Sequence, residues 1–170
     1  MKNWIPVPGS KKETIIKLAL EQFKEKGYEG VNIKDLAKEA NMTTGVIYHH
    51  FGSKAQLYSV IRQDVEQRII DRMEGAADTV SDPVNKLKMA LVTGLDATIK
   101  LRVGRLLCEE NPHAADKIEE FVLQLLEGTI AGLEFIVLPS WRSILAAIEN
   151  EKIDLGQGRE LIAWLFQKKL

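Results

Sequence analysis

The sequence predicts an all-α protein, with a small three-helix N-terminal domain followed by a larger helical bundle. Apolar residues recur with the 3.6-residue period of helices, and no stretch alternates apolar with polar residues long enough to indicate a strand. Capping residues and glycines divide this pattern into short segments before residue 54 and longer ones after it. The 170 residues, 45% of them hydrophobic, suffice for a core without disulfide or metal staples.

Periodicity and caps define the first two helices. Four apolar residues share one face of a helix predicted over residues 11–26: Ile16, Ala19, Leu20 and Phe23. Gly27 is expected to end this helix, because glycine readily adopts the left-handed conformation of a helix terminus. Asn32 is predicted to cap a second helix of about two turns. Its buried stripe consists of Ile33, Leu36, Ala37 and Ala40.

A third short helix follows a tight break at Asn41-Met42. Thr43 is predicted to cap this helix, which runs through His50. Two short capped helices that meet across a tight turn are typical of a helix-turn-helix. The second of them would present its outer face to DNA, while Ile47 and Phe51 pack inward. Gly45 costs about 1 kcal/mol relative to alanine inside a helix, a cost that close approach to a DNA groove would offset.

The fourth helix is expected to link the two domains. Ser53 is predicted to cap it, residues 54–74 to form it, and Gly75 to end it. Its inward residues are spaced by four: Leu57, Ile61, Val65 and Ile69. We therefore expect residues 1–53 to form the N-terminal domain and residues 54–170 the C-terminal domain.

Longer apolar faces predict the helices of the C-terminal domain. Asp82-Pro83 opens a helix, with Val84, Leu87, Leu91, Leu95 and Ile99 inward. Asn111-Pro112 breaks the chain, and a broad apolar face then predicts a long helix over residues 115–137, which Pro139 ends. That face consists of Ile118, Phe121, Val122, Leu125, Leu126, Ile130 and Leu133.

Two more segments complete this domain. One further helix is predicted from Trp141, Ile144, Leu145 and Ile148. Asp154-Leu155-Gly156 is then expected to turn the chain into a last apolar segment, formed by Leu161, Ile162, Trp164, Leu165 and Phe166.

Composition excludes several classes of protein. No apolar run resembles a signal peptide or a membrane span, and the single cysteine, Cys108, cannot form an intrachain disulfide, so the expected location is the cytoplasm. The net charge of −1 conceals an asymmetry: residues 1–62 carry ten Lys and Arg against six Asp and Glu, and the remainder carries thirteen against eighteen. The N-terminal part is therefore suited to an anionic partner such as nucleic acid.

The segment from Val31 to Leu57 resembles the DNA-binding domain of the TetR/AcrR family of bacterial transcriptional regulators. The matching pattern is Ile33-x-x-Leu36-Ala37-x-x-Ala40 followed by Gly45-x-Ile47-Tyr48-x-His50-Phe51-x-Ser53-Lys54-x-x-Leu57. The resemblance covers residues 11–58 closely and the remainder only in helix count and order. It implies a homodimer that reads a palindromic operator in double-stranded DNA, with a larger helical domain that binds a small effector and forms the dimer interface.

The resemblance also assigns expected DNA contacts. These are Thr43, Thr44, Gly45, Val46, Tyr48, His49 and Lys54. Tyr48 resembles the family's phosphate or base-edge contact, and Lys54 resembles its phosphate contact. Further positive charge comes from Lys2, Lys11, Lys12, Lys34 and Lys38.

Two departures from the family pattern bear on recognition. The turn has Asn41-Met42 in place of Gly-Val, and asparagine tolerates the left-handed conformation. Residues 43–50 contain no Arg, Lys, Asn or Gln, so these residues cannot supply the strongest bidentate contacts to bases. We therefore expect specificity to depend on threonine hydroxyls, on methyl contacts to thymine and on DNA shape.

Other candidate sites have simpler explanations. Adjacent residues on a helix point about 100° apart, so His49 and His50 are not expected to share a metal; one should face DNA and the other pack. Glu110-x-x-His113 has the spacing of a di-iron ligand pair, but a second such pair is absent from the sequence. Cys108 is interpreted as a small buried apolar residue.

The sequence does not decide which residues line the effector pocket. The tryptophans Trp141 and Trp164 could line a pocket or belong to the core or a dimer contact. Arg102 and Arg105 could anchor a ligand or form a solvated face. No ligand-binding residue is assigned, and no cofactor is expected.

These observations predict a ligand-responsive regulator, most simply a dimeric repressor that a small effector releases from its operator. The alternative is a constitutive or architectural DNA-binding protein whose C-terminal domain contacts partners. An enzyme is not expected, because no catalytic constellation with workable spacing is present. The sequence stops at residues 167–170, where the family usually has a further interface helix, so we expect a shortened or truncated member that dimerises through the 115–137 helix and the last one.

Overall fold

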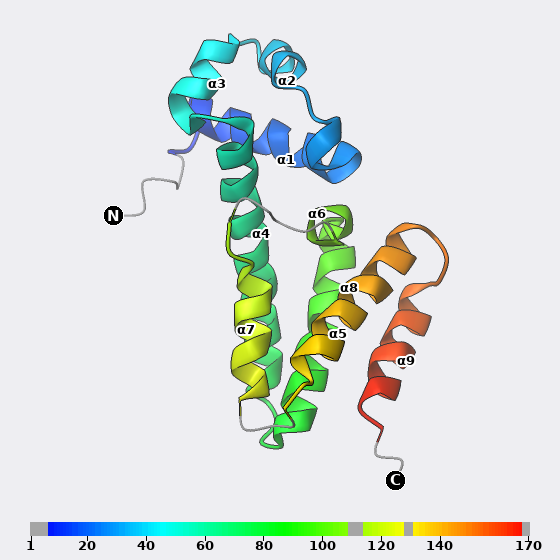
Figure 1. Ribbon diagram of the computed structural model, residues 1–170. Helices are drawn as coiled ribbons and strands as arrows, with labels where there is room; N and C mark the ends of the chain where they lie inside the picture. Colours follow the sequence, from blue (N-terminus) through cyan, green and yellow to red (C-terminus); the bar gives the residue numbers. More distant parts are fainter. Residues whose placement is uncertain (1–6, 109–113, 128–130, 168–170) are drawn as a thin grey trace. The chain divides into compact units, whose positions relative to one another are not determined.

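A computed structural model describes residues 7–108, 114–127 and 131–167, and all regular structure in these ranges is helical (Figure 1). The chain divides into two compact units. One contains the described residues up to Asp64, and the other contains most of those from Val65 onward. Helix α4, Lys54–Ala77, contributes to both units. None of the described helices combines the length and apolar character that a membrane span requires.

Three helices and the first part of α4 form the N-terminal unit. They are α1 (Lys11–Gly30), α2 (Ile33–Glu39) and α3 (Thr44–Phe51). The residues that join them in a core are almost completely buried: Ile15, Ala19, Phe23, Leu36, Ile47, Leu57 and Tyr58. The ring of Tyr58 lies edge-on to Phe23, 5.0 Å between centroids, and to Tyr28, 4.9 Å away. This cluster attaches α1 to the start of α4.

The predicted turns of this unit are largely confirmed. Asn32 accepts a hydrogen bond from the Lys34 amide at 2.8 Å, and Ser53 Oγ accepts one from the Gln56 amide at 3.1 Å. Asn41 has φ 53°, the left-handed conformation expected at the turn. Gly27 has φ 69°, but one further helical turn follows before α1 ends at Gly30. The prediction for Thr43 is wrong in one respect: it occupies the N-cap position of α3, but its side chain makes no capping hydrogen bond.

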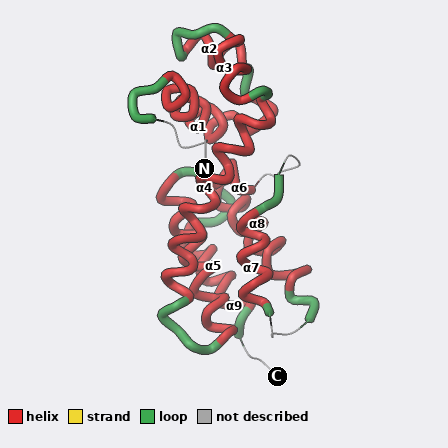
Figure 2. The backbone as a smooth tube through the Cα atoms, turned by 90° about the vertical axis from the view of Figure 1, so that its left-hand side faces the viewer, coloured by secondary structure: helices red, strands yellow, loops and turns green. Residues whose placement is uncertain are grey.

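Among the described residues, five further helices belong to the second unit (Figure 2, which colours every helix red). They are α5 (Pro83–Leu101), α6 (Gly104–Cys108), α7 (Lys117–Leu126), α8 (Glu134–Glu149) and α9 (Leu155–Leu165). Helix α8 packs against α6, α7 and α9, and α5 packs against α9. Trp141 of α8 is a core residue, 1% exposed, and its indole donates a hydrogen bond to the Leu91 carbonyl at 3.0 Å.

Predicted helix ends in this unit are wrong where burial overrides local signals. Gly75 lies inside α4, because the buried residues Met73 and Ala77 keep the helix on the core. Pro139 lies inside α8; it removes one backbone hydrogen bond, but burial of Leu138 and Trp141 on either side offsets that loss. Asp154 caps α9: its carboxylate accepts a hydrogen bond from the Gln157 amide, and its own amide donates one to the Gln157 side chain. Leu155-Gly156 is therefore the first turn of α9 rather than a loop.

The single helix predicted over residues 115–137 is replaced by α7 and the start of α8. Glu127 has an extended conformation, with ψ 128°, and Gly132 has φ 94°, so neither can continue a helix. Ile130, like Asn111, Pro112 and the Glu110/His113 pair, lies outside the described residues. Arg102 and Arg105 are exposed, and Arg102 ends α5 in a left-handed conformation. Cys108 is half-buried.

Candidate nucleic-acid interface

Helix α3 is held against the N-terminal unit by one face only. Ile47 is fully buried and Phe51 is 6% exposed, so two residues one turn apart attach the helix to the core. The turn before it is closed by a hydrogen bond from the Met42 amide to the Ala37 carbonyl, 2.8 Å. The rest of the α3 surface therefore points away from its own domain, as a helix that enters a DNA groove requires.

Four of the six residues between positions 43 and 49 that are expected to contact DNA lie on this outward surface. Thr43, Gly45, Tyr48 and His49 are exposed, whereas Thr44 and Val46 are half-buried. Tyr48 has 47% of its surface exposed.

Gly45 has no neighbour that requires a glycine. A Cβ atom built at this position would meet only Thr43 Oγ1, at 3.7 Å, and φ is not in the left-handed region. Internal packing therefore does not explain why a residue that weakens helices is present. The bare backbone at Gly45 leaves room for close approach of an external surface.

The two histidines differ from the expectation that one of them packs. Both are exposed, with ring centroids 5.5 Å apart, because Ile47 and Phe51 already occupy the inward face of α3. Among the residues that the structure describes, no three His, Cys, Asp or Glu side chains come together in a group that could hold a metal.

Basic residues flank the exposed face of α3. Lys34 and Lys38 of α2 are exposed, and they line a surface groove of about 480 Å³ that continues onto Asn41, Thr43 and Thr44. The sequence identified these lysines as general positive charge but did not place them beside the N-terminus of α3. Lys2 lies outside the described residues.

Lys54 is half-buried at the start of α4. Its ammonium lies 4.5 Å from the centroid of the Tyr28 ring and 3.4 Å from the Glu29 carbonyl oxygen. These contacts orient the side chain, so a phosphate would meet an ammonium whose position is already restricted. The sequence could not reveal this arrangement, because residues 28 and 54 come together only through packing of α1 on α4.

Comparisons with known proteins identify the same region. The family model described as "Bacterial regulatory proteins, tetR family" matches residues 15–61. The HTH-type transcriptional regulator AcrR of Shigella flexneri is 30% identical over 113 residues, 66% of this chain and 53% of that protein. The HTH-type transcriptional repressor KstR2 of Mycolicibacterium smegmatis is 28% identical over 90 residues, 53% of this chain and 44% of that protein. The chain thus spans about half the length of the curated relatives it matches.

A solved structure extends the likeness in fold beyond the N-terminal region. The transcriptional regulator FadR of Bacillus subtilis, in complex with stearoyl-CoA, aligns with 93% of this chain and 98% of its own, with a TM-score of 0.68 and 16% identity. The family-model match, the similar curated regulators and this shared fold place the chain in the TetR family of helix-turn-helix transcriptional regulators.

Proposed function

We propose that the protein is a ligand-responsive repressor that binds a palindromic operator as a homodimer and leaves it when a small molecule binds. The observation that carries this proposal is the outward face of α3, which is exposed around Tyr48 while Ile47 and Phe51 hold the helix from behind. Similarity to the repressor KstR2 and to a regulator that binds stearoyl-CoA supports repression and ligand response respectively.

In this proposal the two predicted domains have separate roles. Residues 1–53 bind DNA through Thr43, Thr44, Gly45, Val46, Tyr48 and His49 in the major groove. Lys54, the first residue of α4, adds a phosphate contact. Residues 54–170 bind the effector and the second copy. An effector would shift the population between two placements of the recognition helices through α4, the helix that belongs to both units.

Selection of bound fragments from random duplex DNA tests this function. We expect a two-fold symmetric consensus whose half-sites lie about one helical turn apart, since paired recognition helices enter successive major grooves. Binding of unrelated sequences with equal affinity would contradict the proposal, and a single asymmetric half-site would contradict the homodimer.

Lys54→Ala is expected to weaken binding about equally for all DNA sequences. The plot of log affinity against log salt concentration should lose about one unit of slope per protomer, because one phosphate contact is removed. Lys17→Ala is the matched control: Lys17 is exposed on α1 and pairs with Glu13 at 2.7 Å, so the slope should not change. An unchanged slope for Lys54→Ala would remove this residue from the phosphate contacts.

Dimerisation is assigned to α8 and α9 in place of the 115–137 helix expected from the sequence. A groove of about 460 Å³ between these helices is lined by large apolar residues that are 42–80% exposed: Phe135, Ile136, Leu161 and Trp164. Adjoining exposed apolar residues on a folded protein mark an interaction surface. We propose that this surface, called here the α8/α9 face, contacts its equivalent on a second copy.

A further inference from the structure

Two histidines lie in the last turn of α3, the helix that is proposed to enter DNA. His49 and His50 are both exposed, and their ring centroids are 5.5 Å apart. The His50 ring also lies edge-on to the Phe51 ring, 6.2 Å between centroids. Among the residues that the structure describes, neither imidazole forms a hydrogen bond or an ion pair. No described partner therefore fixes the charge of either ring.

The elements around α3 contribute lysines. Lys12 of α1 places its ammonium 5.9 Å from the ring centroid of Phe51, the residue after His50. Lys34 and Lys38 of α2 flank the opposite end of α3, and Lys54 begins α4. In the free protein these like charges oppose a further positive charge on the imidazoles. A DNA phosphate reverses this balance, because an adjacent anion favours the charged form of histidine.

The carboxylates of α1 and α2, the helices that pack against α3, do not neutralise the histidines. Glu13 pairs with Lys17 at 2.7 Å, and Glu39 accepts a hydrogen bond from Gln22 at 2.5 Å. Asp35 is exposed in the first turn of α2. Within the described part of the chain no carboxylate is bonded to either imidazole, so phosphate would be the first anionic partner of these rings.

We propose that operator binding is coupled to proton uptake by His49 and His50, so that the protein binds its operator more tightly as the pH falls. Histidine changes charge between about pH 5 and 8, the range in which other side chains ordinarily do not. The carbonyl end of α3 favours a cation at both positions, and a DNA phosphate adds to this effect in the complex. This inference rests on the proposed function, because it requires the exposed face of α3 to contact DNA.

The direction follows from proton linkage. If phosphates stabilise the imidazolium, the complex holds more protons than the free protein, and a fall in pH favours the complex. Each imidazolium that gains a phosphate partner is expected to contribute about tenfold in affinity. Lowering the pH from about 8 to about 5.5 should therefore tighten operator binding by about 10- to 100-fold.

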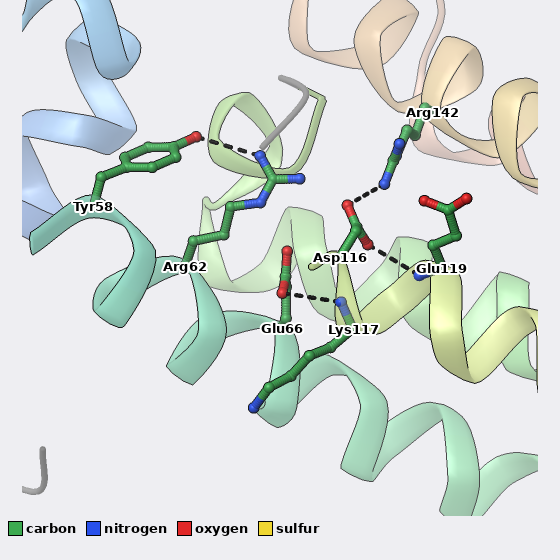
Figure 3. Close-up of polar contacts among 7 residues, drawn as sticks. All are labelled: Tyr58, Arg62, Glu66, Asp116, Lys117, Glu119 and Arg142. Atoms are coloured by element: carbon green, nitrogen blue, oxygen red, sulfur yellow. Dashed lines mark hydrogen bonds and ion pairs between the residues drawn. The ribbon is translucent and has the colours of Figure 1, made fainter. Parts of the chain in front are cut away.

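A second cluster of ionisable side chains is not expected to contribute over this range. In the C-terminal unit Asp116 pairs with Arg142, and Glu66 accepts a hydrogen bond from the Lys117 amide at 3.4 Å (Figure 3). The residues drawn in Figure 3 include no histidine. The third histidine of the sequence, His113, lies outside the described residues, so its contribution is tested by substitution.

Fluorescence anisotropy of the full chain on its selected operator, at fixed ionic strength from about pH 8 to about pH 5.5, measures the coupling. His49→Gln combined with His50→Gln should make the affinity nearly constant over this range, because glutamine does not titrate. His113→Gln is the matched control and should keep the pH dependence of the parent. A thermal melt at each pH shows that every chain is folded. Isothermal titration in buffers of different ionisation enthalpy should show proton uptake by the parent and less by the double variant.

The outcomes separate this inference from the proposed function. An operator affinity that does not change with pH, or that rises as much in the double variant as in the parent, would overturn proton coupling through these histidines and leave the proposed function standing. Loss of the pH dependence in His113→Gln would overturn it as well. Absence of operator binding at every pH would overturn both.

Discussion

Tyr48→Ala is expected to weaken operator binding by about 10- to 100-fold, equivalent to about 1–3 kcal/mol for loss of one well-placed groove contact. Thermal stability should stay close to that of the parent, because Tyr48 is 47% exposed and points away from the core that Ile47 completes. Fluorescence anisotropy on the selected operator, with a thermal melt of the same sample, measures both quantities.

Two neighbouring substitutions make this test specific. Tyr48→Phe keeps the ring and removes only the hydroxyl, so it separates a ring contact from a hydrogen bond to phosphate or base. Ile47→Ala should give the opposite pattern and lower the melting temperature, because Ile47 is fully buried. If Tyr48→Ala binds the operator as tightly as the parent, the outward face of α3 does not contact DNA as proposed.

The N-terminal unit could be predicted from sequence because its signals are local. Asn32 and Ser53 cap helices through their own backbone neighbours, and Asn41 supplies the left-handed residue that the turn needs. The inward residues of α2, α3 and α4 follow helical spacing and are buried as expected. On α1 the predicted face is half right: Ala19 and Phe23 are fully buried, but Ile15 is buried in place of Ile16, and Leu20 is half-buried.

The C-terminal unit could be predicted less well because its decisive contacts join distant residues. The ion pair of Asp116 with Arg142 spans 26 positions, and the hydrogen bond of Lys117 with Glu66 spans 51. Neither pairing leaves a periodic signal along the chain. Pro139 and Gly75 are strong local breakers, yet packing on both sides keeps each of them inside a helix.

The sequence also could not locate the pocket. Trp141, considered as a possible pocket residue, is instead the largest fully buried side chain among the described residues, and Trp164 is 66% exposed on the α8/α9 face. Both residues lie in apolar segments of similar character, so only the packing of α8 distinguishes core from surface. A groove lined by residues of α7 and α8 forms because α7 ends at Leu126 and the chain turns back into α8. The single helix expected over residues 115–137 did not predict that end.

Trp164→Asp is expected to convert the proposed dimer into a monomer and to weaken operator binding by at least about 100-fold. A charged side chain at the centre of two apposed apolar faces would be buried without a partner. A monomer also loses the gain of two linked half-sites, which is about 10²–10⁴ in affinity. Light scattering after gel filtration gives the mass, and anisotropy on the full operator gives the affinity.

Met89→Asp is the matched control for this change. Met89 is also a partly exposed apolar residue, 39% on α5, but it does not line the α8/α9 groove. It should therefore leave both the mass and the operator affinity unchanged.

Because Trp164 is mostly exposed, Trp164→Asp should still melt cooperatively, so loss of binding cannot be attributed to unfolding. A Trp164→Asp chain that remains dimeric would place the interface elsewhere, and a monomeric chain that keeps full operator affinity would remove the need for a dimer in DNA recognition.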